Sequence, residues 1–211
     1  MQRIALLIID MQNDFVLPGS PGYIPGAERI VDSVARLSSF VRERKGLVVH
    51  VIRTYRPDGS DVEAFRLPAF QAGGKLVVQG TRGAKIIEKL TPTENEPVVF
   101  KKRFSGFMNT ELDLLLRRRG ITGVVVCGLQ YPNCVRATVL DAVSLDYTVT
   151  LITDATAGET RAVCEANILD MKNIGVLCVT LKEFRERWKK QTKKSHDADR
   201  TSHASPTRRK A

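Results

Sequence analysis

The stretch that decides the fold is Val124-Val125-Val126-Cys127-Gly128-Leu129-Gln130-Tyr131-Pro132-Asn133-Cys134-Val135-Arg136-Ala137-Thr138. Its apolar run and the polar residues that follow predict a buried strand, a tight turn and the first turn of a helix. Cys134 lies at the junction, where unpaired helix N–H groups and the positive end of the helix dipole favour an anion. We expect this position to lower the pKa of the thiol, so that Cys134 acts as a nucleophile near neutral pH.

Strand and helix patterns alternate along the rest of the chain. Because apolar strands alternate with helices, we expect an α/β fold: a three-layer αβα sandwich with a Rossmann-like parallel sheet of about six strands. The predicted strands are 4–9, 47–52, 97–100, 124–127, 149–152 and 176–179, and the predicted helices are 27–45, 84–90, 110–119, 135–146, 159–172 and 181–190.

A long stretch, residues 54–83, is rich in Gly and Pro and shows neither the helical nor the strand period. Irregular segments of this length inside a compact domain are usually functional. We therefore expect it to form a lid beside the site.

The composition sets further limits. No apolar run is long enough to cross a membrane, and Met1 leads into a strand rather than into a secretory signal. We therefore expect a cytoplasmic protein with no membrane partner, whose four cysteines are reduced thiols. Residues 1–190 should form one domain, whereas the polar, basic stretch 191–211 should be disordered. A solvated basic surface explains the net charge of +10, so no nucleic-acid partner is expected.

Polar residues follow three of the predicted strands. Asp10, Lys101 and Cys134 would converge, because the carboxyl ends of parallel strands lie on one edge of the sheet. The carboxylate could accept the thiol proton, the ammonium could stabilise both anions, and the thiolate could attack an electrophilic carbon. Lys102 is the alternative lysine, although neighbouring residues of a strand point in opposite directions.

Three ordered segments carry a likeness to a known family. They are Ile8–Phe15 (IIDMQNDF), Lys101–Phe107 (KKRFSGF) and Gly128–Val135 (GLQYPNCV), the last followed by Thr138, Asp141-Ala142 and Asp154–Ala157. Together they resemble the isochorismatase-like cysteine hydrolases, in particular a nicotinamidase-like subgroup, over about residues 4–188.

The resemblance implies an Asp–Lys–Cys triad, which falls on Asp10, Lys101 and Cys134. It also implies a cis peptide bond between Leu129 and Gln130, and an oxyanion hole made by the backbone N–H groups of Gln130 and Cys134. It further implies the strand order 3-2-1-4-5-6, a homo-oligomer and a reaction that needs no cofactor.

The segment after the second predicted strand departs from the family pattern. True nicotinamidases of the family hold a metal there with an Asp and histidines, whereas residues 53–63 contain no histidine. Asp58, Asp61 and Glu63 alone are a poor zinc set. We therefore expect no catalytic metal, and we do not expect nicotinamide as the substrate.

Arg53 and Arg56 stand where this segment leaves the sheet. Each could bind a substrate carboxylate bidentately, but pairing with Asp61 or Glu63 would cancel that effect. For Arg53 we weigh substrate binding and structural pairing equally. Three aromatic residues are candidates for the walls of the pocket, although such residues also serve as plain packing: Phe15, Phe107 and Tyr131.

These observations predict a cysteine-dependent hydrolase that cleaves an amide or ureide C–N bond of a small molecule through a thioester intermediate. An isochorismate-type ether hydrolase is one alternative, although the resemblance implies that such enzymes do not use a cysteine nucleophile. A catalytically idle binding protein of the same fold is the other.

Overall fold

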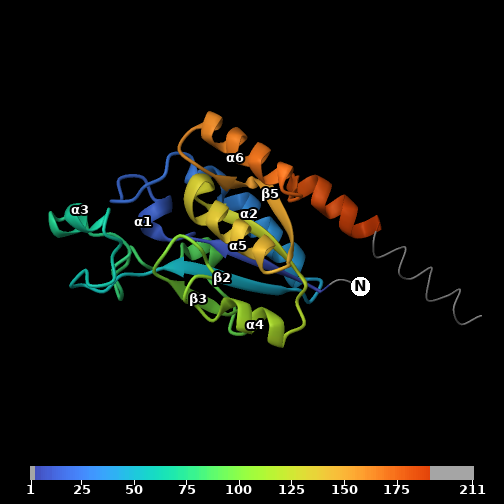
Figure 1. Ribbon diagram of the computed structural model, residues 1–211, viewed down its shortest axis with the longest axis horizontal. Coiled ribbons are helices and arrows are strands. Elements are labelled where there is room, and N and C mark those ends of the chain that lie inside the picture. The colour runs from blue at the N-terminus through green and yellow to red at the C-terminus, as the bar shows by residue number, and fades with distance from the viewer. Residues whose placement is uncertain (1–2, 191–211) are drawn as a thin grey trace, which may run out of the picture.

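The computed structural model describes residues 3–190, so the expectation of a disordered tail over 191–211 lies outside the described residues. The described chain is built on a six-stranded sheet in which neighbouring strands are parallel. The order β3-β2-β1-β4-β5-β6 confirms the prediction (Figure 1). The strands are β1 (Ile4–Ile9), β2 (Leu47–Arg53), β3 (Val98–Lys101), β4 (Gly123–Leu129), β5 (Thr148–Ala157) and β6 (Leu177–Val179).

Helices cover both faces of the sheet, which gives the three layers expected from the sequence. One face is covered by α2 (Ala27–Arg42) and the helical residues 181–190, and the other by α4 (Leu112–Arg118), α5 (Arg136–Ser144) and α6 (Arg161–Asn173). Alternation along β1 explains this arrangement, because Leu6 and Ile8 pack toward α2 whereas Leu7 and Ile9 pack toward α5. In the described part of the chain, no helix combines the length and apolarity that a membrane span requires.

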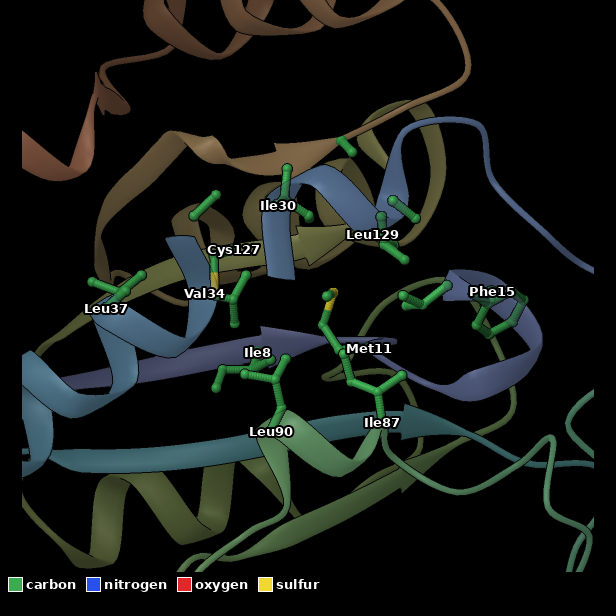
Figure 2. Close-up of a cluster of buried hydrophobic side chains, with 14 of the residues drawn as sticks. Ile8, Met11, Phe15, Ile30, Val34, Leu37, Ile87, Leu90, Cys127 and Leu129 are labelled. Carbon is green, nitrogen blue, oxygen red and sulfur yellow. The ribbon is translucent and has the colours of Figure 1, made fainter. Parts of the chain in front are cut away.

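Figure 2 shows the core on the α2 side of the sheet. It joins side chains from α2, β1 and β4, among them Ile30, Val34, Leu37, Ile8 and Cys127. Phe15 continues the cluster toward the carboxyl end of β1. Cys127 is fully buried, and burial raises the pKa of its thiol far above the ordinary value. It therefore serves as a small apolar side chain.

The strand order reverses between β1 and β4, which lie side by side at the centre of the sheet. Gly128 of β4 lies opposite Ile9 of β1 and has a φ of +108°. A Cβ atom on Gly128 would stand 2.2 Å from the carbonyl oxygen of Ile9. Glycine is therefore required where the two strands approach, at the point where sheets of this type bind their ligands.

The predicted helix over residues 84–90 is wrong. Ile86 instead forms an antiparallel bridge with Gln12, and the N–H of Ile87 donates to the carbonyl of Met11 at 3.1 Å. Extended pairing replaces the helix, and what remains is a 3-10 turn, η1 (Glu88–Leu90).

Directly after the central strands β1 and β4, two helical segments begin where the sequence did not predict them. A short helix, α1 (Asn13–Val16), follows β1. The turn after β4 is itself helical, since the π-helical turn η2 (Tyr131–Val135) leads directly into α5. Cys134 therefore lies within the first helical turn rather than just before it.

The segment over residues 54–83 is anchored to the body of the protein. It contains the short helix α3 (Leu67–Gln71), which projects beyond the sheet (Figure 1). Tyr55 is fully buried and pairs with Val78 in a parallel bridge. Asp14 accepts a hydrogen bond of 2.6 Å from the N–H of Val77. The segment is therefore attached to the rest of the protein by backbone pairing and hydrogen bonds, and it forms an anchored wall at the carboxyl edge of the sheet.

Candidate active site

Asp10, Lys101 and Cys134 gather at the carboxyl edge of the sheet. Asp10 directly follows β1, Lys101 is the last residue of β3, and Cys134 lies in η2 after β4. The three residues are 2%, 0% and 7% exposed, in that order. Residues so distant in sequence meet because parallel strands end on the same edge.

Asp10 and Lys101 form a buried ion pair. Nζ of Lys101 lies 2.8 Å from Oδ2 of Asp10, and it also donates to the carbonyl of Arg103 at 3.3 Å. Oδ1 of Asp10 is buried and accepts no hydrogen bond from the described residues. One carboxylate oxygen is therefore held by the lysine, and the other can accept a proton from a neighbour.

The thiol of Cys134 is that neighbour. Burial raises the pKa of the Cys134 thiol above its ordinary value, and the Asp10 carboxylate raises it further, whereas Lys101 and Arg53 lower it. This direction corrects the sequence-based expectation, which considered the helix N-terminus and the Lys101 ammonium but not burial. Burial is the largest cause of this shift, and it depends on the folded chain rather than on the helix N-terminus alone.

Lys102 points away from this group. Its Nζ donates to the carbonyl oxygen of Thr54 at 2.6 Å and lies 2.9 Å from Oδ2 of Asp61. Successive residues project in opposite directions at the end of β3. The structure therefore brings Lys101, and not Lys102, to Asp10.

Arg53 is the last residue of β2, and its guanidinium reaches the nucleophile. Nη2 of Arg53 lies 3.3 Å from Sγ of Cys134. Nη1 donates to the hydroxyl of Tyr55 at 2.6 Å and to the carboxylate of Glu63. Burial alone would lower the pKa of Arg53, but the negative charges around it, led by those of Cys134 and Asp10, raise it. Arg53 is thus paired with Glu63 and also touches the sulfur atom.

A cavity of about 330 Å³ is lined by Asp10, Arg53 and Cys134. Its walls include Phe15, Tyr23, Arg66, Leu76, Phe104 and Gln130. This volume is at the small end of the range for ligand pockets. It suits a small-molecule ligand placed against the sulfur atom.

Three of the predicted substrate-binding residues lie outside the cavity lining. Arg56 is exposed on the segment after β2. Phe107 is buried and stacks on Tyr147 with ring centroids 5.8 Å apart. Tyr131 is 1% exposed and belongs to the core on the α5 side of the sheet. The contacts of Phe107 and Tyr131 are those of packing residues.

Several cavity residues carried no signal in the sequence. Arg66 and Leu76 come from the irregular segment after β2, and Tyr23 comes from the loop before α2. The paths of such segments cannot be inferred from periodicity. Phe104 could have been found, because it lies inside the motif Lys101–Phe107.

The loop that carries the nucleophile is held by its own hydrogen bonds. The peptide bond between Leu129 and Gln130 is cis. The carbonyl of Gln130 accepts from the N–H groups of Asn133 and Val135, at 3.2 and 3.1 Å. These two residues flank Cys134, whose position in the loop is fixed by them.

The segment after β2 is poorly suited to hold the metal that, by the family resemblance, true nicotinamidases bind there. It brings Arg53, Tyr55 and Glu63 into contact, and a guanidinium repels a cation. Within residues 3–190, no three His, Cys, Asp or Glu side chains gather as a set that could hold a metal ion. The donor set is a poor one for zinc.

Comparison with known proteins agrees with this fold. Residues 4–183 match the family described as Isochorismatase domain. The Arabidopsis thaliana protein named Probable inactive nicotinamidase is 46% identical over 189 residues, which cover 88% of this chain and 96% of that protein. Maleamate amidohydrolase of Pseudomonas putida is 30% identical over 179 residues, which cover 81% of this chain and 79% of that protein.

A solved structure of a family member also matches this fold. The crystal structure of an isochorismatase family protein from Desulfovibrio vulgaris superimposes with a TM-score of 0.86 and 48% identity, covering 89% of this chain and 99% of that one. The chain therefore belongs to the isochorismatase family of hydrolases, whose members include amidohydrolases. The homo-oligomer implied by the resemblance stays a prediction.

Proposed function

We propose that this protein is a cysteine-dependent amidohydrolase that cleaves an amide or ureide C–N bond of a small molecule through a thioester intermediate. The observation that carries the proposal is the buried Lys101–Asp10 ion pair beside the Cys134 thiol in a cavity. A thiol, a base for its proton and a cation to hold that base are what nucleophilic acyl transfer requires. One relative is named as an amidohydrolase of maleamate, which supports this reaction class.

The reaction begins with a proton transfer. Oδ1 of Asp10 accepts the proton of Cys134, while Lys101 occupies Oδ2. The thiolate then attacks the carbonyl carbon of the substrate. Before the C–S bond forms, the cations of Lys101 and Arg53 stabilise the negative charge on sulfur.

The tetrahedral intermediate needs hydrogen-bond donors for its oxyanion. We assign this role to the backbone N–H groups of Gln130 and Cys134, two residues of the cavity lining. Support comes from the carbonyl of Gln130, which engages the N–H groups on either side of Cys134. Asp10 then returns its proton to the nitrogen of the leaving group, the C–N bond breaks, and ammonia or an amine departs.

Water completes the cycle. Asp10, again a carboxylate, accepts a proton from a water molecule as the water oxygen attacks the thioester carbonyl. The C–S bond breaks, the proton returns to the thiolate of Cys134, and a carboxylic acid leaves. The net reaction adds one water molecule across the C–N bond, so its atoms and protons balance.

Of the predicted substrate-binding residues, Phe15 and Arg53 line the cavity. Phe15 is 8% exposed and belongs to the core, so we assign it to the apolar wall of the substrate site. Arg53 touches Sγ of Cys134, so we assign it to the nucleophile rather than to a distant group of the substrate.

Ammonia release from a panel of small carboxamides and ureides tests the proposal. We expect turnover of part of the panel, and Cys134→Ala should reduce it by at least about 100-fold. Cys178→Ala, on β6 and outside the cavity lining, is the matched control and should keep full activity. An ether hydrolase would still cleave an isochorismate-type enol ether after Cys134→Ala. That result would reject the amidohydrolase proposal in favour of an ether hydrolase.

A catalytically idle protein of the same fold is the second candidate, because the name of the Arabidopsis relative includes the word inactive. Such a protein would release ammonia from no compound of the panel. It would also form no acyl adduct on Cys134 with an activated ester, whereas an amidase would form one. Mass measurement of the peptide that contains Cys134 distinguishes the two candidates.

A further inference from the structure

One arginine in the cavity lining has an unmatched hydrogen-bonding group. Arg66 directly precedes α3 and lines the cavity, and its side chain is 26% exposed. Its Nε atom is nevertheless buried, with no hydrogen-bond partner among the described residues. A buried guanidinium N–H without an acceptor costs free energy, so an acceptor supplied by a ligand would be stabilised there.

Glu63 is the carboxylate beside Arg66, but it is committed elsewhere. Its Oε2 atom lies 3.8 Å from Nε of Arg66, beyond hydrogen-bond distance. Oε1 accepts from Arg53, and Oε2 accepts from the hydroxyl of Tyr55 at 2.5 Å. Two arginines therefore share one carboxylate, which leaves one positive charge in excess on this side of the cavity.

The two carboxylates of the cavity lining are engaged away from Arg66. Asp10 is paired with Lys101. Glu159 accepts a hydrogen bond of 3.1 Å from the side-chain amide of Gln130. The positive charge beside Glu63 is therefore a local feature at Arg66 that an anionic group would complement.

We propose that the substrate amide carries a carboxylate, and that Arg66 binds this carboxylate while the scissile C–N bond lies against Cys134. The proposal rests on the amidohydrolase function above. An arginine fork and a carboxylate match in charge and in planar geometry. A cation–π contact with Phe65 helps to hold Arg66 in place, because Cζ of Arg66 lies 4.9 Å from the centroid of the Phe65 ring.

The residues between Arg66 and the sulfur set the length of the substrate. Arg53 touches Sγ of Cys134, Glu63 touches Arg53, and Arg66 lies beyond Glu63. Because Arg53 and Glu63 stand between Arg66 and the sulfur in this chain of contacts, we expect the carboxylate of the substrate to be several bonds from the scissile carbonyl. An acid whose carboxylate adjoins the amide carbon, such as oxamate, should be too short to reach Arg66.

Hydrolysis of dicarboxylic acid monoamides tests the proposal directly. Oxamate, succinamate and glutaramate are compared, each beside its uncharged methyl ester. We expect kcat/KM to favour a longer acid over its ester by about tenfold or more, with little preference for oxamate. Arg66→Gln should abolish the preference mainly through KM, and Arg66→Lys should restore part of it. Arg56→Gln removes an exposed arginine that lies outside the cavity lining and should change nothing.

Protection of Cys134 gives a readout that does not need turnover. Glutarate has no C–N bond to cleave, and bound glutarate should slow alkylation of Cys134 by iodoacetamide. The half-protecting concentration should rise about tenfold in Arg66→Gln and stay unchanged in Arg56→Gln.

Two results would overturn the role of Arg66. One is that uncharged esters are hydrolysed as well as the acids; the other is that Arg66→Gln changes neither the preference nor the protection. If no compound releases ammonia, the hydrolase itself fails, and the protection measurement still decides whether Arg66 binds a carboxylate.

Discussion

Nη2 of Arg53 lies 3.3 Å from Sγ of Cys134. The guanidinium is held in that position because Nη1 of Arg53 is bound to Tyr55 and Glu63. A fixed cation at this distance favours the thiolate over the thiol, which opposes the effect of burial. Arg53 therefore sets how readily Cys134 gives up its proton.

Removal of Arg53 should raise the pKa of Cys134. The double variant Arg53→Gln/Glu63→Gln avoids leaving the buried carboxylate of Glu63 without its cation. We expect the midpoint of the pH profile for alkylation of Cys134 to move up by about one unit or more. Glu63→Gln alone keeps the cation and should not raise the midpoint. An unchanged midpoint in the double variant would show that Arg53 does not act on the sulfur.

Asp10→Asn should move activity and thiol reactivity in opposite directions. The substitution removes the proton acceptor, so ammonia release should fall by about 100-fold or more. It also removes the carboxylate that raises the pKa of Cys134, so alkylation should begin at lower pH. Both are measured on the same variant, with Asp14→Asn, outside the cavity lining, as the comparison. If alkylation shifts to higher pH instead, Asp10 does not face the thiol as a carboxylate.

Lys101→Met and Lys102→Met form a matched pair of neighbouring substitutions. Lys101→Met leaves the buried Asp10 carboxylate without its cation, so it should lower the free energy of unfolding by about 3–5 kcal/mol. Activity should fall at least about 100-fold. Lys102 is paired with Asp61 near the surface, so Lys102→Met should cost within about 1 kcal/mol and leave activity nearly unchanged. Urea unfolding and ammonia release measure the two effects, and equal effects in both variants would refute the assignment.

Gly128→Ala tests the approach of the two central strands. The added Cβ atom would stand 2.2 Å from the carbonyl oxygen of Ile9, at a φ of +108°. We expect a loss of about 3 kcal/mol or more in the free energy of unfolding. Gly19→Ala is the control, because Gly19 also has a positive φ but has nothing within 4 Å of the added atom. The control should lose only about 1–2 kcal/mol.

Glu96 should make stability fall in acid. It accepts hydrogen bonds from Arg42 and lies 3.2 Å from Nε2 of the buried His50. Although burial would raise the pKa of Glu96, the hydrogen bond from Arg42 and the others around the carboxylate lower it from the ordinary 4.5 to about 2. The folded state therefore binds fewer protons than the unfolded state between these values, and stability present above pH 4.5 is lost as the pH falls toward 2. Urea unfolding of Glu96→Gln should show lower stability at pH 7 and a weaker dependence across this range. If the free energy of unfolding falls with pH equally steeply in the wild type and in Glu96→Gln, the prediction is contradicted.

The sheet and the meeting of Asp10, Lys101 and Cys134 could be predicted because both follow from connectivity. A buried strand that is followed by a helix places its last residues at the carboxyl edge, whatever the details of the loops. The apolar spacing of the run that contains Ile86 was interpreted as helical, although it is equally suited to the extended pairing of Ile86 with Gln12. Short apolar runs do not distinguish these two outcomes.

The rest of the site depends on packing that local sequence does not reveal. The choice between ligand binding and pairing for Arg53 is decided by where Glu63 comes to lie, ten residues further along an irregular segment. The same segment supplies Arg66, which has no partner that could be inferred from spacing. The direction of the Cys134 pKa shift was missed because burial is a property of the whole fold.

The anchored wall over residues 54–83 has a consequence for how the proposed substrate preference can be changed. The groups assigned to bond making lie at strand ends or in η2, whereas Arg66 and Leu76 reach the cavity from this wall. Engineers can therefore exchange the stretch from residue 64 to residue 76 to change which molecules are accepted, provided that Glu63 is kept to brace Arg53. On these assignments, substrate preference and bond making depend on different parts of the chain, so one can be redesigned while the other is left intact.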